Sequence, residues 1–127
     1  MSNKHLNPCV RFGHFLLEKR KKAGKTARIV AGEAELLPSN YSKIETGTVR
    51  PPQDPKKLKL LGKAIGLQHE DDWSQYHDLA AKANETVPLD LVSIIGEREL
   101  VPVFLRTVRN KQVSDAILKE IIHKLQD

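Results

Sequence analysis

Apolar residues recur at helical spacing along most of the chain, and no segment shows the alternation of a half-buried strand. Residues 10–82 divide into five such stretches, which predicts five helices. Their apolar positions are Phe12, Leu16 and Ala23; Ala27, Val30, Ala31 and Ala34; Tyr41 and Ile44; Leu58, Leu61 and Ile65; and Trp73, Tyr76 and Ala80. The expected fold class is therefore all-α.

Residues that start and stop helices stand at the ends of these stretches. Thr26 can cap the second helix with its hydroxyl group, and Pro38 suits the first turn of the third. Gly24 and Gly47 stand where the first and third helices should end, since glycine tolerates the left-handed conformation common at helix C-termini. These residues therefore support the helices predicted from the apolar spacing.

Beyond Asn84 the helical period weakens. Residues 84–99 mix a proline, a glycine and short apolar runs, which predicts a connector with about one helical turn. Two small helices should follow, one over Val101 to Arg109 and one capped by Ser114. We therefore expect a domain at residues 1–83, a connector at 84–99 and a helical appendage at 100–127. The appendage is too short to bury much surface alone, so it needs the first domain or a second chain as a partner.

The charge of the chain is unevenly distributed. Residues 1–67 contain 14 Lys or Arg and 5 Asp or Glu, a net charge of +9, whereas residues 68–127 contain 7 and 11, a net charge of −4. A strongly basic segment suggests a polyanionic partner, usually nucleic acid, although a solvated basic face has the same composition. With one cysteine no internal disulfide can form, and no apolar run suits a signal peptide or a membrane helix. A cytoplasmic protein without membrane contact is expected.

The segment LLPSNYSKIETG, residues 36–47, predicts a short helix with an unusual exposed face. Tyr41 and Ile44 form its apolar edge. Most surface helices carry Glu and Lys, whereas Ser and Asn disfavour a helix interior. Helix stability therefore does not explain the residues on the exposed face, which are Ser39, Asn40, Ser42 and Lys43.

The longer segment KTARIVAGEAELLPSNYSKIETGTVRPP resembles the helix-turn-helix of phage repressor-like (XRE-like) transcriptional regulators. PSNYSKIETG is similar to the family pattern S-P-S-x-x-S-K-I-E-x-G, and Arg50, Pro51 and Pro52 match the R-P-P that follows it. The resemblance covers residues 10 to about 67 and implies a five-helix domain whose third helix lies in the DNA major groove. Short hydrogen-bonding side chains fit close to base edges there.

The resemblance also implies roles for individual residues. Arg20 and Glu45 occupy the positions of an ion pair that joins two helices and holds the arginine near a phosphate; two solvated, unpaired charges are the alternative. Thr26 and Arg28 fall where relatives contact the DNA backbone at a helix N-terminus, although Thr26 could serve only as a cap. The implied DNA-binding residues are Thr26, Arg28, Ser39, Asn40, Ser42, Lys43, Thr48, Arg50 and Arg20.

Three residues depart from the family pattern. Glu35 stands where relatives have a turn glycine, and a glutamate adopts the left-handed conformation less easily than glycine does. Leu37 replaces a capping Ser or Thr, so it cannot form the side-chain cap. Ala27 replaces a glutamine that contacts DNA. The resemblance therefore predicts the fold more directly than it predicts any single base contact.

Neither catalysis nor metal binding is expected, so the protein is predicted to be no enzyme and to need no cofactor. The histidines lack both a cysteine partner and HExxH spacing, and solvated side chains are expected at His5, His14, His69, His77 and His123. Asp71 and Asp72 suit the first turn of the fifth helix, where carboxylates interact favourably with the helix dipole. Cys9 has no assigned base that would make it a redox centre.

The expected function is that of a sequence-specific DNA-binding regulator, a repressor that binds a palindromic operator as a homodimer. The appendage should form the dimer interface, unless its apolar residues complete the core of the first domain; these residues are Phe104, Leu105, Val108, Ile117, Ile121 and Leu125.

Two other functions fit the sequence. The tail VPVFLRTVRNKQVSDAILKEIIHKL resembles tails of repressors encoded beside metallopeptidases that inactivate them, which implies an antitoxin-like or peptidase-controlled regulator with a toxin or metallopeptidase partner. The other is a protein-interaction module that retains the helix-turn-helix fold without binding DNA, because fold alone does not assign function.

Overall fold

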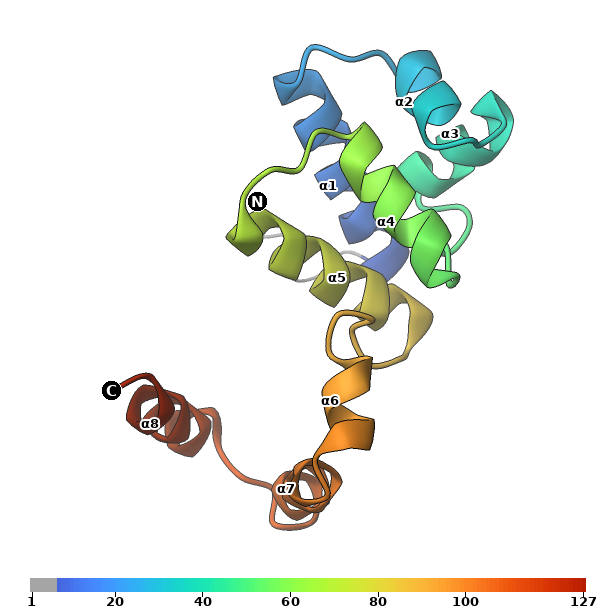
Figure 1. Cartoon of the computed structure of the whole chain (residues 1–127). Coiled ribbons are helices and arrows are strands. Elements are labelled where there is room, and N and C mark those ends of the chain that lie inside the picture. The colour runs from blue at the N-terminus through green and yellow to red at the C-terminus, as the bar shows by residue number, and fades with distance from the viewer. Residues whose placement is uncertain (1–6) are drawn as a thin grey trace. The chain divides into compact units, whose positions relative to one another are not determined.

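The computed structural model describes residues 7–127, which form eight helices and contain no strand (Figure 1). The helices are α1 (Pro8–Lys22), α2 (Ala27–Glu33), α3 (Pro38–Thr46), α4 (Pro55–Ala64), α5 (Glu70–Asn84), α6 (Val92–Glu97), α7 (Leu100–Asn110) and α8 (Asp115–Gln126). The predicted all-α class is thus confirmed. None of these helices is both long and apolar enough to cross a membrane. The chain divides into two compact units, Met1–Asp90 and Leu91–Asp127.

The core of the first unit forms where the apolar sides of α1 to α5 meet. α1 contacts α3 and α5, and α2 contacts α3 and α4. An aromatic cluster lies at the centre, where the ring centroids of Phe12 and Tyr76 are 5.4 Å apart and those of Phe15 and Tyr76 are 6.0 Å apart. Offset or tilted ring pairs of this kind stabilise a core beyond the area that they bury.

Most of the predicted core positions are buried, but the first helix differs from its prediction. Phe15 is buried although it is not among the apolar positions predicted for this helix, and Ala23 is exposed although it is one of them. Ala23 is exposed because α1 ends at Lys22, so Ala23 is the C-cap residue, and Gly24 follows it with a left-handed φ of 72°. Ala27 and Trp73 are only partly buried against the core.

The predicted helix ends are formed by the residues expected to form them. The Thr26 hydroxyl oxygen accepts a hydrogen bond from the Ile29 N–H at 3.2 Å. Pro38 stands in the first turn of α3, and Gly47 closes that helix with a φ of 80°. As expected, Leu37 forms no side-chain cap.

The turn between α2 and α3 is left-handed despite the absence of a glycine. Glu35 has a φ of 57°, the conformation that was expected to be difficult for this residue. Hydrogen bonds on both sides hold the turn, because Glu35 N–H donates to Gly32 O at 3.2 Å and Leu36 N–H donates to Ala31 O at 2.8 Å. Leu36, the next residue, packs against the core. Glu35 thus adopts a left-handed backbone conformation that glycine would adopt more easily, in a turn that is held by hydrogen bonds and by the packing of its neighbour.

The first unit extends beyond the predicted boundary at residue 83. α5 continues to Asn84, and Leu89 packs against the core, so residues 84–90 belong to the first unit. The rest of the predicted connector contains α6. Packing of the partly buried Leu89 side chain against the core is the physical reason that residues 84–90 stay with the first unit, since contact with the core removes part of this apolar side chain from water.

The second unit consists of α6, α7 and α8, and none of its residues is buried. Both predicted tail helices are present, and the Ser114 hydroxyl oxygen caps α8 by accepting from the Ile117 N–H at 3.3 Å. Of the six residues predicted to form an interface, Val108 and Ile121 are half-buried, whereas four are exposed: Phe104, Leu105, Ile117 and Leu125.

Candidate nucleic-acid interface

α3 presents a face of short polar side chains to solvent. Tyr41 and Ile44, which are 0% and 5% exposed, attach the helix to the core. The four residues predicted on the opposite face, Ser39, Asn40, Ser42 and Lys43, are all exposed. Among the ion pairs of residues 7–127, none includes Lys43. This face is therefore accessible to a partner.

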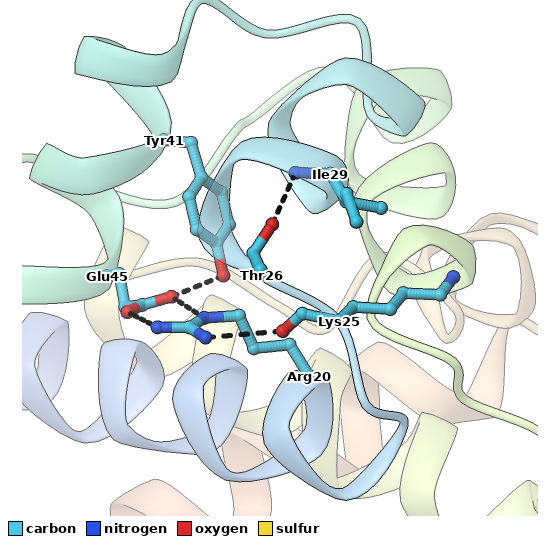
Figure 2. Close-up of polar contacts among 6 residues, drawn as sticks. All are labelled: Arg20, Lys25, Thr26, Ile29, Tyr41 and Glu45. Carbon is cyan, nitrogen blue, oxygen red and sulfur yellow. Dashed lines mark hydrogen bonds and ion pairs between the residues drawn. The ribbon is translucent and has the colours of Figure 1, made fainter.

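Arg20 connects α3 to two other parts of the chain (Figure 2). Its Nε and Nη2 donate to the two carboxylate oxygens of Glu45, each at 2.8 Å, and its Nη1 donates to the Lys25 carbonyl oxygen at 3.3 Å. The side chains of Arg20 and Glu45 are both 14% exposed. The ion pair implied by the resemblance is therefore present. It is bidentate, so it fixes the relative orientation of the guanidinium and carboxylate groups as well as their distance.

Tyr41 is a third member of this network. Its hydroxyl group donates to Glu45 Oε2 (Figure 2). Burial and the hydrogen bond to Glu45 raise the pKa of Tyr41, so the phenol keeps its proton and acts as a donor. The apolar spacing predicts Tyr41 only as a core residue. The four-residue spacing of Tyr41 and Glu45 was the available signal, because side chains four apart are neighbours on a helix.

The network is charged at neutral pH. Burial by itself raises the pKa of Glu45, but hydrogen bonds from Arg20 and Tyr41 outweigh burial and hold that pKa below its ordinary value. The hydrogen bond with Glu45 raises the pKa of Arg20. Glu45 is therefore an anion with an arginine and a phenol as donors. Because the Glu45 carboxylate has hydrogen-bond donors on both oxygens, the network favours the one orientation of α3 on α1 that keeps these bonds.

A second contact between α1 and α3 involves Gly13, a glycine that the apolar spacing does not single out. A Cβ atom on Gly13 would lie 2.0 Å from the Glu45 carbonyl oxygen and 3.0 Å from the Ile44 carbonyl oxygen. The two helix backbones therefore approach more closely than any other residue type would allow. The signal in the sequence was a glycine inside an otherwise helical pattern.

The end of α3 is held in the same way. A Cβ atom on Gly47 would lie 2.7 Å from the Val10 Cα, and the left-handed φ of Gly47 already favours glycine. Together, Gly13, Gly47 and the Arg20 network hold the C-terminal half of α3 against α1.

The residues predicted around α3 fall on two neighbouring segments. Thr26 and Arg28 are exposed at the start of α2, a helix that contacts α3. The Arg20 hydrogen bond to the Lys25 carbonyl holds the residue just before Thr26 (Figure 2). Arg28 belongs to no ion pair within residues 7–127, whereas Lys25 pairs with Glu33 at 2.8 Å.

In the segment that follows α3, Thr48 and Arg50 are exposed. The hydroxyl groups of Thr46 and Thr48 lie 2.9 Å apart in a hydrogen bond, and the Thr48 N–H donates to the Lys43 carbonyl oxygen at 2.9 Å. The chain after α3 is therefore ordered around Thr48. Thr46 was missed in the sequence analysis, and its exposure beside Thr48 adds it to the candidate face.

One histidine contradicts its prediction. His14, His69 and His123 are exposed, as expected, and His5 lies outside the described residues. His77 is instead half-buried and stacks on Trp73 with ring centroids 6.0 Å apart. The four-residue spacing places both rings on one side of α5, which explains the partial burial. Within residues 7–127, no group of three or more His, Cys, Asp or Glu could hold a metal ion.

Comparison with protein-family models, curated proteins and solved structures found no match to this chain. The function is therefore inferred from the residues and contacts described above.

Proposed function

We propose that this protein is a sequence-specific DNA-binding transcriptional regulator, in which α2 and α3 act as the helix-turn-helix of a five-helix, repressor-like first unit. The observation that carries the proposal is the exposed face of α3. Asn40 has two donors and an acceptor carbonyl, while Ser39 and Ser42 have hydroxyl groups that both donate and accept. Such short side chains let a helix approach the edges of base pairs in the major groove.

The way α3 is held supports this proposal. A helix that presents base-reading side chains must keep its orientation, because ordering it during binding would reduce the affinity. Gly13 brings the α1 backbone against α3, and the Arg20–Glu45–Tyr41 network joins the same helices through hydrogen bonds. α3 is therefore oriented before any partner binds.

The charges around the face support a phosphate-rich partner. Residues 1–67 carry a net charge of +9, with 14 Lys or Arg and 5 Asp or Glu. Arg28, Lys43 and Arg50 are exposed, and no ion pair of residues 7–127 uses them. Each cation that neutralises a phosphate releases counterions, which favours binding at low salt.

We assign base readout to Asn40, Ser39 and Ser42, and base or phosphate contact to Lys43. Asn can bond an adenine edge through two hydrogen bonds. Phosphate contacts are assigned to Thr26, Arg28, Thr48, Arg50 and Arg20. Arg20 has five N–H groups, and two remain for a phosphate beyond the three hydrogen bonds of its network.

The test begins with selection of a binding site from random duplex DNA, with the fragment upstream of the gene as a second source. Asn40→Ala should weaken binding to the selected site by about 1–3 kcal/mol and relax the preference at one base pair. Lys82→Ala is the charge-matched control for Lys43→Ala, because Lys82 is exposed at the end of α5, a helix that packs on α1. The proposal fails if an Asn40→Ala, Lys43→Ala double variant binds the selected site as tightly as wild type does.

Salt dependence separates DNA binding from a role in protein interaction. Affinity should fall steeply between about 50 and 200 mM salt, by about tenfold or more for several phosphate contacts. A flat response, together with no selected sequence, would instead support a protein-interaction module.

We further propose that the second unit makes the protein a homodimer on a palindromic operator with half-sites about 34 Å apart. α7 and α8 carry exposed or half-buried apolar side chains and contain no buried residue. The interface would use the six residues Phe104, Leu105, Val108, Ile117, Ile121 and Leu125.

Ending the chain after Asp90 tests the dimer, because the core of the first unit uses residues that precede this point. The truncated protein should sediment as a folded monomer that still binds a half-site but loses tight binding to the full operator. A truncated protein that remains dimeric would place the interface in the first unit. One that unfolds would show that the second unit completes the core.

A further inference from the structure

Leu37 is an exposed apolar residue at the start of α3, the helix to which base readout is assigned. Its side chain is 66% exposed, the highest value among the large apolar side chains of residues 7–90. Its carbonyl oxygen accepts a hydrogen bond from the Tyr41 N–H at 3.0 Å, so Leu37 belongs to the first turn of the helix. Asn40 follows three residues later, a rise of about 4.5 Å along the helix axis. Leu37 is therefore accessible to a partner that contacts Asn40.

The stability of α3 does not explain a leucine at this position. Leu37 is the N-cap residue, and it forms no side-chain cap. Ser, Thr, Asp or Asn would accept a hydrogen bond from a free N–H group of the first turn and so stabilise the helix. Leucine lacks that bond and also leaves apolar surface in water, which is unfavourable. Because both effects lower stability, contact with a partner is the better explanation for this residue.

Exposed apolar side chains of the first unit gather in the segment that contains α2 and α3. Between residues 7 and 90, the exposed large apolar side chains are those of Ile29, Leu37, Val49 and Val87. Three of these four lie within residues 26–50, which also include every residue assigned to DNA except Arg20. A single exposed apolar residue needs no explanation, whereas several in one short segment indicate a contact surface. The contact surface therefore offers apolar groups as well as hydrogen-bonding ones.

We propose that Leu37 contacts the 5-methyl group of a thymine, within about two base pairs of the position that Asn40 reads. In the major groove the base pairs present hydrogen-bond donors and acceptors, and the methyl group of thymine is the apolar group among them. A leucine side chain that packs on this methyl group removes both apolar surfaces from water. The inference rests on the proposed DNA-binding function, and it adds the base that the start of α3 prefers.

Replacement of thymine by uracil tests this contact, because uracil lacks only the 5-methyl group and keeps the same hydrogen-bonding groups. Each thymine in one half-site of the DNA selected from random duplexes is replaced in turn, and the affinity of the full chain is measured by fluorescence anisotropy. Wild type should bind about three- to fourfold more weakly when the contacted thymine is replaced, the change expected for one buried methyl group.

Three variants assign the methyl contact to a residue. Leu37→Ala should bind thymine and uracil DNA equally at this position, whereas Val87→Ala, a control with an exposed apolar residue outside residues 26–50, should keep the wild-type ratio. Leu37→Ser should also lose the preference for thymine, although the new cap should raise the melting temperature by roughly 2–8 °C. A residue with only a structural role would not change stability and base preference in opposite directions. Thermal melting identifies any variant that fails to fold, and the uracil scan on wild type and Leu37→Ala then decides.

Two results would overturn this inference and leave DNA binding intact. One is equal affinity of wild type for thymine and uracil at every position of the half-site. The other is a loss with uracil that Leu37→Ala retains, which would assign the methyl contact to another residue. A protein that selects no sequence and binds no duplex would refute the DNA-binding function itself, and this inference with it.

Discussion

Gly13→Ala should separate α1 from α3, although alanine is the better helix former. The added Cβ would lie 2.0 Å from the carbonyl oxygen and 2.7 Å from the carbonyl carbon of Glu45. Both are backbone atoms, so no side-chain rotation can relieve the contact. The helices must move apart, which also displaces Glu45 from Arg20.

The expected net effect is a loss of stability. Overpacking a core costs about 1–3 kcal/mol, and a clash with backbone belongs at the upper end of that range. Replacing glycine by alanine inside a helix contributes about 1 kcal/mol in the opposite direction. The free energy of unfolding should therefore fall by about 2 kcal/mol. For a unit of this size, the melting temperature would fall by roughly 8–16 °C.

Gly32→Ala provides a control with the opposite sign. Gly32 lies in α2, and a Cβ there would have no neighbour within 4 Å. The same substitution should stabilise the protein by about 0.5–1 kcal/mol. Urea denaturation followed by circular dichroism gives both values, with the slope unchanged if the folded and unfolded states stay the same. If Gly13→Ala were as stable as wild type, α1 and α3 would not approach as closely as described.

Three further outcomes are expected. Because Glu45 has a folded pKa below its ordinary value of 4.5, its contribution to stability should be complete above that pH and lost as the pH falls through the folded pKa. The stability gap between wild type and Glu45→Gln, measured by urea unfolding at several pH values, should narrow in that range; a constant gap would contradict the assigned ion pair with Arg20. Tyr76→Phe removes the buried hydrogen bond from the Tyr76 hydroxyl to the Leu58 carbonyl and should cost about 1 kcal/mol in thermal or urea unfolding, whereas no loss would show that the bond contributes nothing. Thr26→Ala should lower the free energy of unfolding by about 1 kcal/mol through loss of the α2 cap, whereas Thr26→Ser keeps the hydroxyl group and should lose much less in the same urea unfolding. Equal losses in the two variants would implicate the threonine methyl group instead of the cap.

The features that could be predicted from the sequence are those governed by neighbouring residues. The five helices predicted within residues 10–82 followed from apolar spacing, and Thr26, Pro38 and Gly47 marked helix ends because capping and left-handed geometry act within a few residues. The exposed face of α3 followed from the same periodicity, since burial of Tyr41 and Ile44 on one edge of the helix leaves Ser39, Asn40, Ser42 and Lys43 exposed. The Arg20–Glu45 pair joins distant segments, and only the resemblance to a known family pointed to it.

Other features depend on segments that meet only when the chain folds. Nothing local distinguishes Gly13 from another helical glycine until α3 lies against it. The hydrogen bond from Tyr41 to Glu45 likewise belongs to a network whose third member, Arg20, comes from α1. His77 was expected in solvent, but the ring of Trp73 and the packing around α5 bury one of its nitrogens. The boundary at Asp90 likewise depends on Leu89 finding the core. Spacing along one helix specifies which side chains share a face, whereas close approach and burial depend on which other elements cover that face, and only the tertiary structure decides this.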